Sequence, residues 1–96
     1  MKGELKMINL IEIAIKGQNR LAKHKEYVTG VKMVMKELNT IKVYNGDKKS
    51  CIQYFIDKIN LATINMIIHK DNKELLNSHI GMVALYNAII SILLED

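Results

Sequence analysis

The feature that most constrains this chain is the spacing of its apolar residues, which recur every three or four positions along most of the 96-residue sequence. This spacing places side chains on one face of an α-helix. The sequence contains no proline and only five glycines, so few positions would interrupt long helices. We therefore predict an all-α fold, a small helical bundle formed by a single domain of residues 1–96.

The basic N-terminal part, residues 1–44, carries one apolar stripe over its first forty positions. The stripe consists of Met7, Leu10, Ala14, Gly17, Leu21, His24, Val28, Val31, Met35 and Leu38. Glycine costs about 1 kcal/mol in a helix interior, so residues 17–19 and 29–30 could each interrupt a helix. One long helix, two helices or three short ones are all compatible with the pattern. The alternation in residues 40–44 indicates a strand or an irregular end, and residues 45–47 are the clearest turn in the chain.

Residues 47–94 are predicted to form a C-terminal antiparallel helical hairpin. The start of its first helix is marked by Ser50 with Gln53 three residues later, the pattern of a capping box, and Asp47 is an earlier candidate cap. The same pattern recurs at residues 71–74. Only a short polar connection separates the two apolar repeats, and so short a connection forces the helices to run side by side.

The predicted hairpin has more apolar residues than one narrow stripe can hold. A chain of this length buries only about 65% of the surface that its unfolded form exposes. A single further element at the N-terminus would leave much of the hairpin in contact with water. We therefore predict a homo-oligomer, with the C-terminal hairpin as its main interface.

Composition and terminal patterns narrow the class and the location of the protein. The single cysteine, Cys51, cannot form an internal disulfide, which excludes a disulfide-stapled secreted protein, and 49% hydrophobic residues exclude a disordered chain. The charged start is followed by a segment that Asn9 and Glu12 interrupt, with no small-residue cleavage site, which does not fit a signal peptide. The apolar run of residues 80–94 is shorter than the ~20 residues that span a bilayer. We expect a cytoplasmic protein with no membrane segment.

The sequence patterns of catalysis and of metal binding are missing. There is no glycine-rich phosphate loop, no His-Glu-x-x-His pair and no cysteine-centred signature. His69 and His79 would lie roughly 10 Å apart along the predicted hairpin, too far to share one metal ion. Cys51 has no ligand partner at a spacing typical of metal sites. We predict a protein that is not an enzyme and that uses no metal and no cofactor.

Positive charge is concentrated in the first half of the chain: residues 1–49 carry a balance of +6 and residues 50–96 a balance of −2. This distribution favours a basic part that meets an anion and an apolar part that packs or oligomerises. Two clusters combine basic residues, which would bind phosphate, with tyrosine, on which a base could stack. A helix N-terminus at residues 48–50 would add unpaired N–H groups. The candidate ligand-binding residues are Arg20, Lys23 and Tyr27 in the first cluster and Tyr44, Lys48, Lys49 and Ser50 in the second.

The segment of residues 81–89, GMVALYNAI, is similar to the last helix of small phage proteins that sequester cyclic nucleotides and thereby block the bacterial defence called CBASS. These anti-CBASS proteins share their hairpin with sponge proteins that act against Thoeris defence. The resemblance covers residues 44–94. It implies helical subunits that end in an antiparallel hairpin, assemble into oligomers, hold signalling nucleotides in pockets between subunits and catalyse no reaction.

Three functions are compatible with the sequence. The first is a non-enzymatic, oligomeric binding protein, phage-encoded, that sequesters an anionic nucleotide signal in the host cytoplasm to counter bacterial defence. The second is a small DNA-binding regulator, with residues 29–38 as the recognition helix, a hairpin over residues 41–54 as the wing of a winged-helix fold, and the basic half facing phosphates. The third is a protein-interaction module of the bacteriocin-immunity kind, which also tends to be a small basic four-helix bundle.

Overall fold

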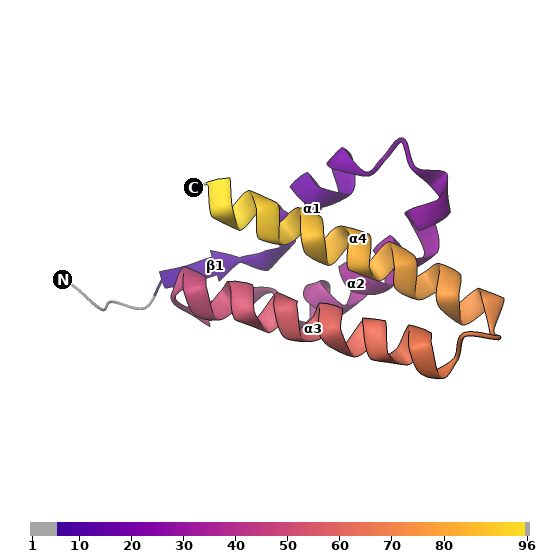
Figure 1. Cartoon of the computed structure of the whole chain (residues 1–96). Helices are drawn as coiled ribbons and strands as arrows, with labels where there is room; N and C mark the ends of the chain where they lie inside the picture. Colours follow the sequence, from indigo (N-terminus) through magenta and orange to yellow (C-terminus); the bar gives the residue numbers. More distant parts are fainter. Residues whose placement is uncertain (1–5, 96) are drawn as a thin grey trace.

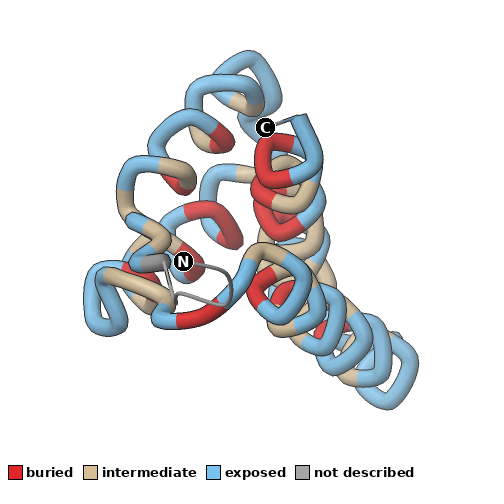
Figure 2. The backbone as a smooth tube through the Cα atoms, turned by 90° about the vertical axis from the view of Figure 1, so that its left-hand side faces the viewer, coloured by how far each residue is buried: buried red, intermediate tan, exposed pale blue. Residues whose placement is uncertain are grey.

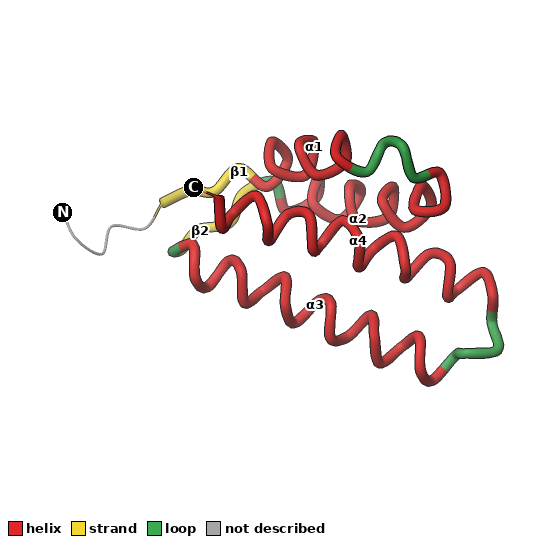
Figure 3. Tube along the Cα trace, turned by 45° about the horizontal axis from the view of Figure 1, so that its top comes forward, coloured by secondary structure: helices red, strands yellow, loops and turns green. Residues whose placement is uncertain are grey.

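The computed structural model describes residues 6–95 and is mostly helical over that range, which confirms the predicted helical bundle. Two short strands are the part that the all-α prediction missed. After α3 the chain reverses, so that α4 runs back beside it (Figures 1 and 3). The elements in chain order are β1 (Lys6–Asn9), α1 (Leu10–Arg20), the single-turn 3-10 helix η1 (Lys25–Tyr27), α2 (Val28–Ile41), β2 (Val43–Gly46), α3 (Lys48–Ile68) and α4 (Lys73–Glu95).

The central helix of the bundle is α4, which packs against α1, α2 and α3. Figure 3 shows it with α3 on one side and α1 and α2 on the other. The side chains of Leu85, Tyr86 and Ile89 on this helix are at most 1% exposed. In Figure 2 the buried residues gather where the helices face one another. Leu93 of α4 also belongs to this core, and the other helices contribute Leu10, Ala14, Val31, Val34, Leu38, Cys51 and Phe55.

The length of α4 matters for whether the protein could lie in a membrane, because the helix is longer than the apolar run of residues 80–94. It spans 23 residues, and by length and composition it could cross a membrane. In the structure 33% of its most apolar window is buried, and its buried residues belong to the core between the helices. A core helix passes the same test of length and composition. The cytoplasmic location therefore stays a prediction.

The N-terminal stripe forms two α-helices joined by a single 3-10 turn, one of the three arrangements that the sequence left open. The two glycine segments do not break it: Gly17 lies inside α1 and Gly30 inside α2, and both are buried. The break falls instead at residues 21–24, because α1 and α2 both pack against α4 and the chain must turn between them. Met7 was assigned to the stripe wrongly, since it lies on β1 and is 70% exposed.

The two strands form a small antiparallel sheet in which Ile8 is paired with Tyr44 and Asn9 with Val43. The prediction of a strand or irregular end at residues 40–44 is confirmed in part, because α2 continues to residue 41 before β2 begins. The sheet ties the start of α1 to the end of α2, two points that are far apart in the sequence.

The strand pairing corrects the winged-helix interpretation. Residues 48–54 form the first turns of α3 rather than the second strand of a wing, and β2 pairs with β1 instead. Val31 and Val34, on the segment proposed as the recognition helix, are 6% and 0% exposed and belong to the core. The wing predicted over residues 41–54 was therefore wrong.

Of the two candidate caps of α3 the structure confirms Asp47, and the cap of α4 lies one residue after the predicted Asp71. Oδ1 of Asp47 accepts a hydrogen bond from the N–H of Ser50 at 2.7 Å, so Asp47 caps α3 and Ser50 does not. Gln53 donates to an acidic side chain one turn further on instead of reaching back to the helix start. At the start of α4 the side chain of Asn72, rather than that of Asp71, accepts a backbone N–H at 3.1 Å. In both places the capping side chain lies three residues before the N–H that it accepts.

Lys42, which ends α2, has a positive φ of 70° with ψ at −52°. Its N–H donates to the carbonyl of Leu38 at 2.7 Å, and its own carbonyl accepts the N–H of Leu10 at 3.0 Å. A residue with a side chain pays about 1–2 kcal/mol in such a conformation, and glycine does not. We predict that Lys42→Gly raises the free energy of unfolding in urea by about 1 kcal/mol. The matched variant Lys36→Gly, inside the same helix, should lower it by about 1 kcal/mol, and an equal loss in both variants would contradict the prediction.

Candidate functional site

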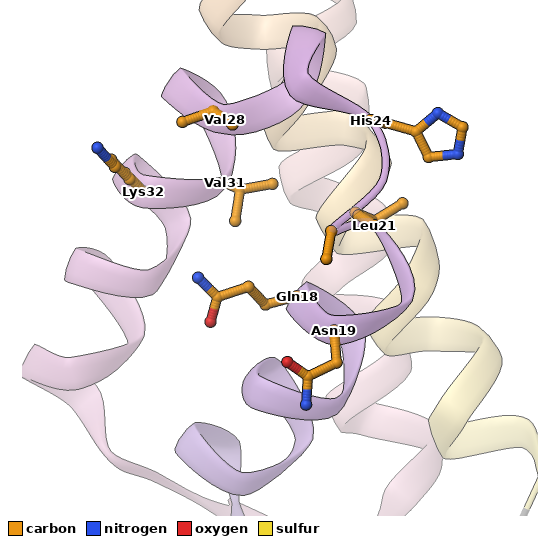
Figure 4. A pocket seen from close by; sticks show the side chains of 8 residues that line it. Gln18, Asn19, Leu21, His24, Val28, Val31 and Lys32 are labelled. Atoms are coloured by element: carbon orange, nitrogen blue, oxygen red, sulfur yellow. The ribbon is translucent and has the colours of Figure 1, made fainter.

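A pocket of about 360 Å³ lies between the end of α1 and the start of α2. Figure 4 shows Gln18 and Val31 extending toward each other across it, with Leu21 beside them, whereas the ends of Lys32 and His24 point outward. The lining therefore combines apolar side chains with two amides, those of Gln18 and Asn19, and the basic groups stand at the rim. The residues that line the pocket are Gln18, Asn19, Leu21, Ala22, His24, Val28, Val31 and Lys32.

The pocket results from the way in which α1 and α2 approach α4. A Cβ atom at Gly17 would lie 2.9 Å from the Leu85 side chain, so the missing side chain brings α1 close to α4. Gly30, near the start of α2, lies directly against Gly81 of α4. Both helices therefore pack closely against α4. The pocket lies between them, beside the connecting segment 21–27, and eight side chains line it.

The basic groups that line the pocket are the Lys32 ammonium and the His24 ring. The ring of His24 lies 5.4 Å from that of Tyr27, and its Nδ1 lies 3.7 Å from a carboxylate oxygen of Glu26. Lys23 is exposed in the turn, and Lys32 is exposed on α2. An anionic group at the mouth would therefore meet the Lys32 side chain, which remains in contact with water.

Arg20, the first of the predicted binding residues, forms an ion pair with Glu95 at the end of α4. Its two terminal nitrogens donate to the two carboxylate oxygens at 2.8 and 2.7 Å. This hydrogen bonding raises the pKa of the Arg20 guanidinium and lowers the pKa of the Glu95 carboxyl. An anionic ligand would have to compete with Glu95 for this side chain.

The second predicted cluster lies at the start of α3, where the carboxylate of the capping residue Asp47 already provides a negative charge. The Asp47 carboxylate accepts the N–H of Ser50, and this hydrogen bond lowers the pKa of the carboxyl. Lys48 and Lys49 occupy the first turn of the helix, and Tyr44 on β2 places its ring 6.1 Å from a second tyrosine ring. A phosphate at this helix N-terminus would therefore meet a carboxylate there.

The residues of the two predicted clusters lie in two separate parts of the structure. The α1–α2 connection and the start of α3 lie toward opposite ends of the molecule in Figures 1 and 3. The lining residues of the α1–α2 pocket include none of the seven predicted side chains, although Arg20, Lys23 and Tyr27 are neighbours of them in the sequence. The sequence analysis missed Gln18 and Lys32, which line the same pocket only because the chain turns between α1 and α2.

A second polar arrangement that the sequence analysis missed joins α2, α3 and α4. Glu37 accepts a hydrogen bond from the Tyr86 hydroxyl at 2.8 Å and pairs with the Lys58 ammonium at 2.6 Å. Lys58 also lies 5.5 Å from the centre of the Tyr54 ring. Burial, and then the hydrogen bond to Glu37, raises the pKa of Tyr86, and the hydrogen bond to Glu37 raises the pKa of Lys58.

A small cavity of about 100 Å³ adjoins this polar arrangement. Asn65 and His79 line it together with Glu37 and Lys58. Nδ1 of His79 lies 2.8 Å from the carbonyl of Leu75, within hydrogen-bond distance of its own helix. The cavity has room for about three water molecules at roughly 30 Å³ each. Because it is far smaller than a nucleotide, we interpret this arrangement as a polar contact that orients the three helices.

No group of three or more metal-ligating side chains, counting His, Cys, Asp and Glu, comes together within residues 6–95. The free thiol of Cys51 is buried in the core. The α1–α2 pocket is therefore the arrangement on which a functional proposal can be based.

No protein-family model, curated protein or solved structure matches this chain.

Proposed function

We propose that this protein is a non-enzymatic, homo-oligomeric binding protein that holds a small anionic ligand, a nucleotide, in the pocket between α1 and α2. The resemblance of residues 81–89 to phage sponge proteins points to the biological role, which is to sequester a signalling nucleotide and so counter bacterial defence. The C-terminal hairpin is the proposed site of self-association.

The observation that carries the proposal is the pocket itself. Its volume of about 360 Å³ falls within the range of about 300–1,000 Å³ that is typical of small-molecule sites. Its apolar walls, formed in part by Leu21 and Val31, suit a flat base, and the Gln18 amide can donate to and accept from the edge of that base. The pocket lies within one chain, unlike the sites between subunits that the resemblance implies.

Charge at the mouth of the pocket supports an anionic ligand. Lys32 stands at the rim, and Lys23 is exposed in the adjoining turn. A ligand whose base lies in the pocket would present its phosphate to these side chains. Charge-assisted hydrogen bonds of this kind are stronger than neutral ones and are weakened by salt when they are exposed.

The test is isothermal titration of the full-length protein with a panel of mononucleotides, cyclic mononucleotides, cyclic dinucleotides and ADP-ribose derivatives. We expect at least one ligand to bind, with an affinity that falls as salt is added. Lys32→Gln should weaken binding by about tenfold, because it removes one charged hydrogen bond. Lys36→Gln is the matched control, since Lys36 is exposed on the same helix but does not line the pocket.

Two results would contradict the proposal. One is the absence of heat with every ligand of the panel. The other is an equal loss of affinity in Lys32→Gln and Lys36→Gln, because the ligand would then respond to the overall charge of α2 rather than to the pocket.

A further inference from the structure

The outward face of α3 carries a row of apolar side chains that the described part of the chain leaves exposed. Leu61, Ile64, Ile67 and Ile68 are 56%, 51%, 67% and 64% exposed, and Ile56 at the edge of the row is 37% exposed. We call these five residues the outer α3 patch. Figures 1 and 3 show α3 at the edge of the molecule, with α4 beside it on one side only.

The outer α3 patch is continuous because of its spacing. Leu61, Ile64 and Ile68 are separated by three and four residues, which places them in one line along the helix, with Ile67 directly beside them. This is the spacing of a seam between two packed helices. Buried residues of α3, such as Phe55 and Ala62, lie on the opposite face, so the patch is separate from the core.

The area of the outer α3 patch equals that of the largest apolar patch on a typical monomer. Its five side chains expose roughly 500 Å², within the range of about 300–600 Å² for such patches, which are often functional. In a standard protein interface each partner buries about 800 Å², of which somewhat more than half is non-polar. The patch therefore supplies close to the non-polar area that one partner contributes to a stable dimer.

We propose that the outer α3 patch binds the same patch of a second copy of this chain, with the two α3 helices antiparallel about a twofold axis near Ile64. In that arrangement Ile64 contacts its own copy, and Leu61 of each chain contacts Ile67 and Ile68 of the other. The proposed function includes self-association, and the outer α3 patch is the surface and the antiparallel pair the orientation that we propose for it. The inference rests on the proposed function only for the expectation that copies of the chain associate.

Charges at the two ends of the outer α3 patch disfavour the parallel orientation. Asp57 lies before the apolar row, and Lys70 lies just beyond its end, with Asp71 following. A parallel pair would place Asp57 beside Asp57 and Lys70 beside Lys70, which is unfavourable. An antiparallel pair centred near Ile64 places Asp57 opposite both Lys70 and Asp71 of the other copy, where attraction and repulsion largely offset each other.

The first experiment is sedimentation velocity of the full-length protein over a range of concentrations. We expect a dimer at micromolar concentration, and a monomer with unchanged helical circular dichroism for Ile64→Glu, which places two carboxylates at the twofold axis. Ile15→Glu is the matched control, because Ile15 is 45% exposed on α1 and lies outside the patch. This variant should remain a dimer.

The second experiment tests the orientation by changing one charge. In the antiparallel pair Asp71→Lys places two lysines opposite Asp57 of the other copy, so this variant should tighten the dimer by about tenfold. In a parallel pair the same change would place lysines beside lysines and weaken the dimer. A dimer that Asp71→Lys weakens would overturn the antiparallel arrangement.

Three other outcomes would overturn the inference. The unchanged chain could be a monomer at about 100 µM, well above the micromolar range in which the proposed dimer is expected to form. It could be a dimer that Ile64→Glu does not disrupt, which would place the contact elsewhere. It could be a monomer that binds lipid vesicles through Ile64, which would identify a membrane surface instead. Titration of the Ile64→Glu variant with nucleotides tests the α1–α2 pocket independently of the dimer. The absence of a dimer and the absence of ligand binding can therefore be told apart.

Discussion

Gly81→Ala is expected to lower the free energy of unfolding by about 3 kcal/mol or more, the upper end of what overpacking a core costs. A Cβ atom at this position would lie 2.4 Å from the carbonyl oxygen of Tyr27 and 2.9 Å from the Cα of Gly30. Both contacts are with backbone, which cannot rotate away, so α2 and α4 would have to move apart. The gain in helix propensity from glycine to alanine, about 1 kcal/mol, is too small to offset this.

Gly17→Ala is the matched control for this prediction. Its Cβ atom would lie 2.9 Å from Cδ1 of Leu85, the end of a flexible side chain that can adopt another rotamer. We expect the propensity gain and the steric cost to cancel within about 1 kcal/mol. Gly30→Ala should be as damaging as Gly81→Ala, since its Cβ atom would lie 2.1 Å from the Ser78 carbonyl oxygen in the same helix crossing.

Urea and thermal denaturation followed by circular dichroism measure these effects. For a domain of this size a change of 1 kcal/mol shifts the melting temperature by about 4–8 °C, so Gly81→Ala should melt more than about 12 °C lower or fail to fold. The prediction is wrong if Gly81→Ala and Gly17→Ala have the same stability. The effects of Gly81→Ala and Gly30→Ala should not add, because both act on one contact.

These glycines show how far the sequence determines the fold. The three- and four-residue spacing was sufficient to predict helices, because it reports directly which side of a segment is apolar. It could not place the break in the N-terminal stripe, since the local cost of Gly17 and Gly30 is outweighed by their contacts with α4. The turn at residues 21–24 is set by the position of α4, which lies far away in the sequence.

The candidate site was harder to predict than the fold for the same reason. Sequence proximity grouped Arg20 with Lys23, but the structure pairs Arg20 with Glu95, 75 residues away. The pocket instead combines Gln18 with Lys32, which are brought together only by the packing of α1 and α2 on α4. The order of the residues contains no local pattern that reports such a contact.

Raising the pH above 9 is expected to lower the free energy of unfolding steeply. Cys51 is fully buried, and burial raises the pKa of its thiol from 9.0 to about 11. The unfolded chain loses this proton from about pH 9, whereas the folded chain retains it until about pH 11. The contribution of the buried Cys51 thiol to the free energy of unfolding is therefore fully present below pH 9 and is lost between pH 9 and about pH 11. A shift of two pKa units corresponds to roughly 3 kcal/mol.

The groups around Glu37 act in the same direction at slightly higher pH. Burial raises the pKa of Tyr86 and of Tyr54 above the ordinary 10.0, and the hydrogen bond to Glu37 raises the pKa of Lys58 above 10.5. Each of these groups holds its proton more tightly when the chain is folded. The folded state thus binds more protons than the unfolded state, and stability falls as pH rises through this range.

Urea denaturation in the presence of a reductant, repeated at several pH values from neutral to strongly alkaline, measures this loss. Cys51→Ala should flatten the dependence between pH 9 and about 11, and Tyr86→Phe should flatten it above 10.0, although each variant has its own stability at neutral pH. The comparison is therefore between slopes and not between absolute values. A stability that stays constant up to about pH 11, or a Cys51→Ala slope equal to that of the unchanged chain, would show that these protons are released equally in the folded and unfolded states.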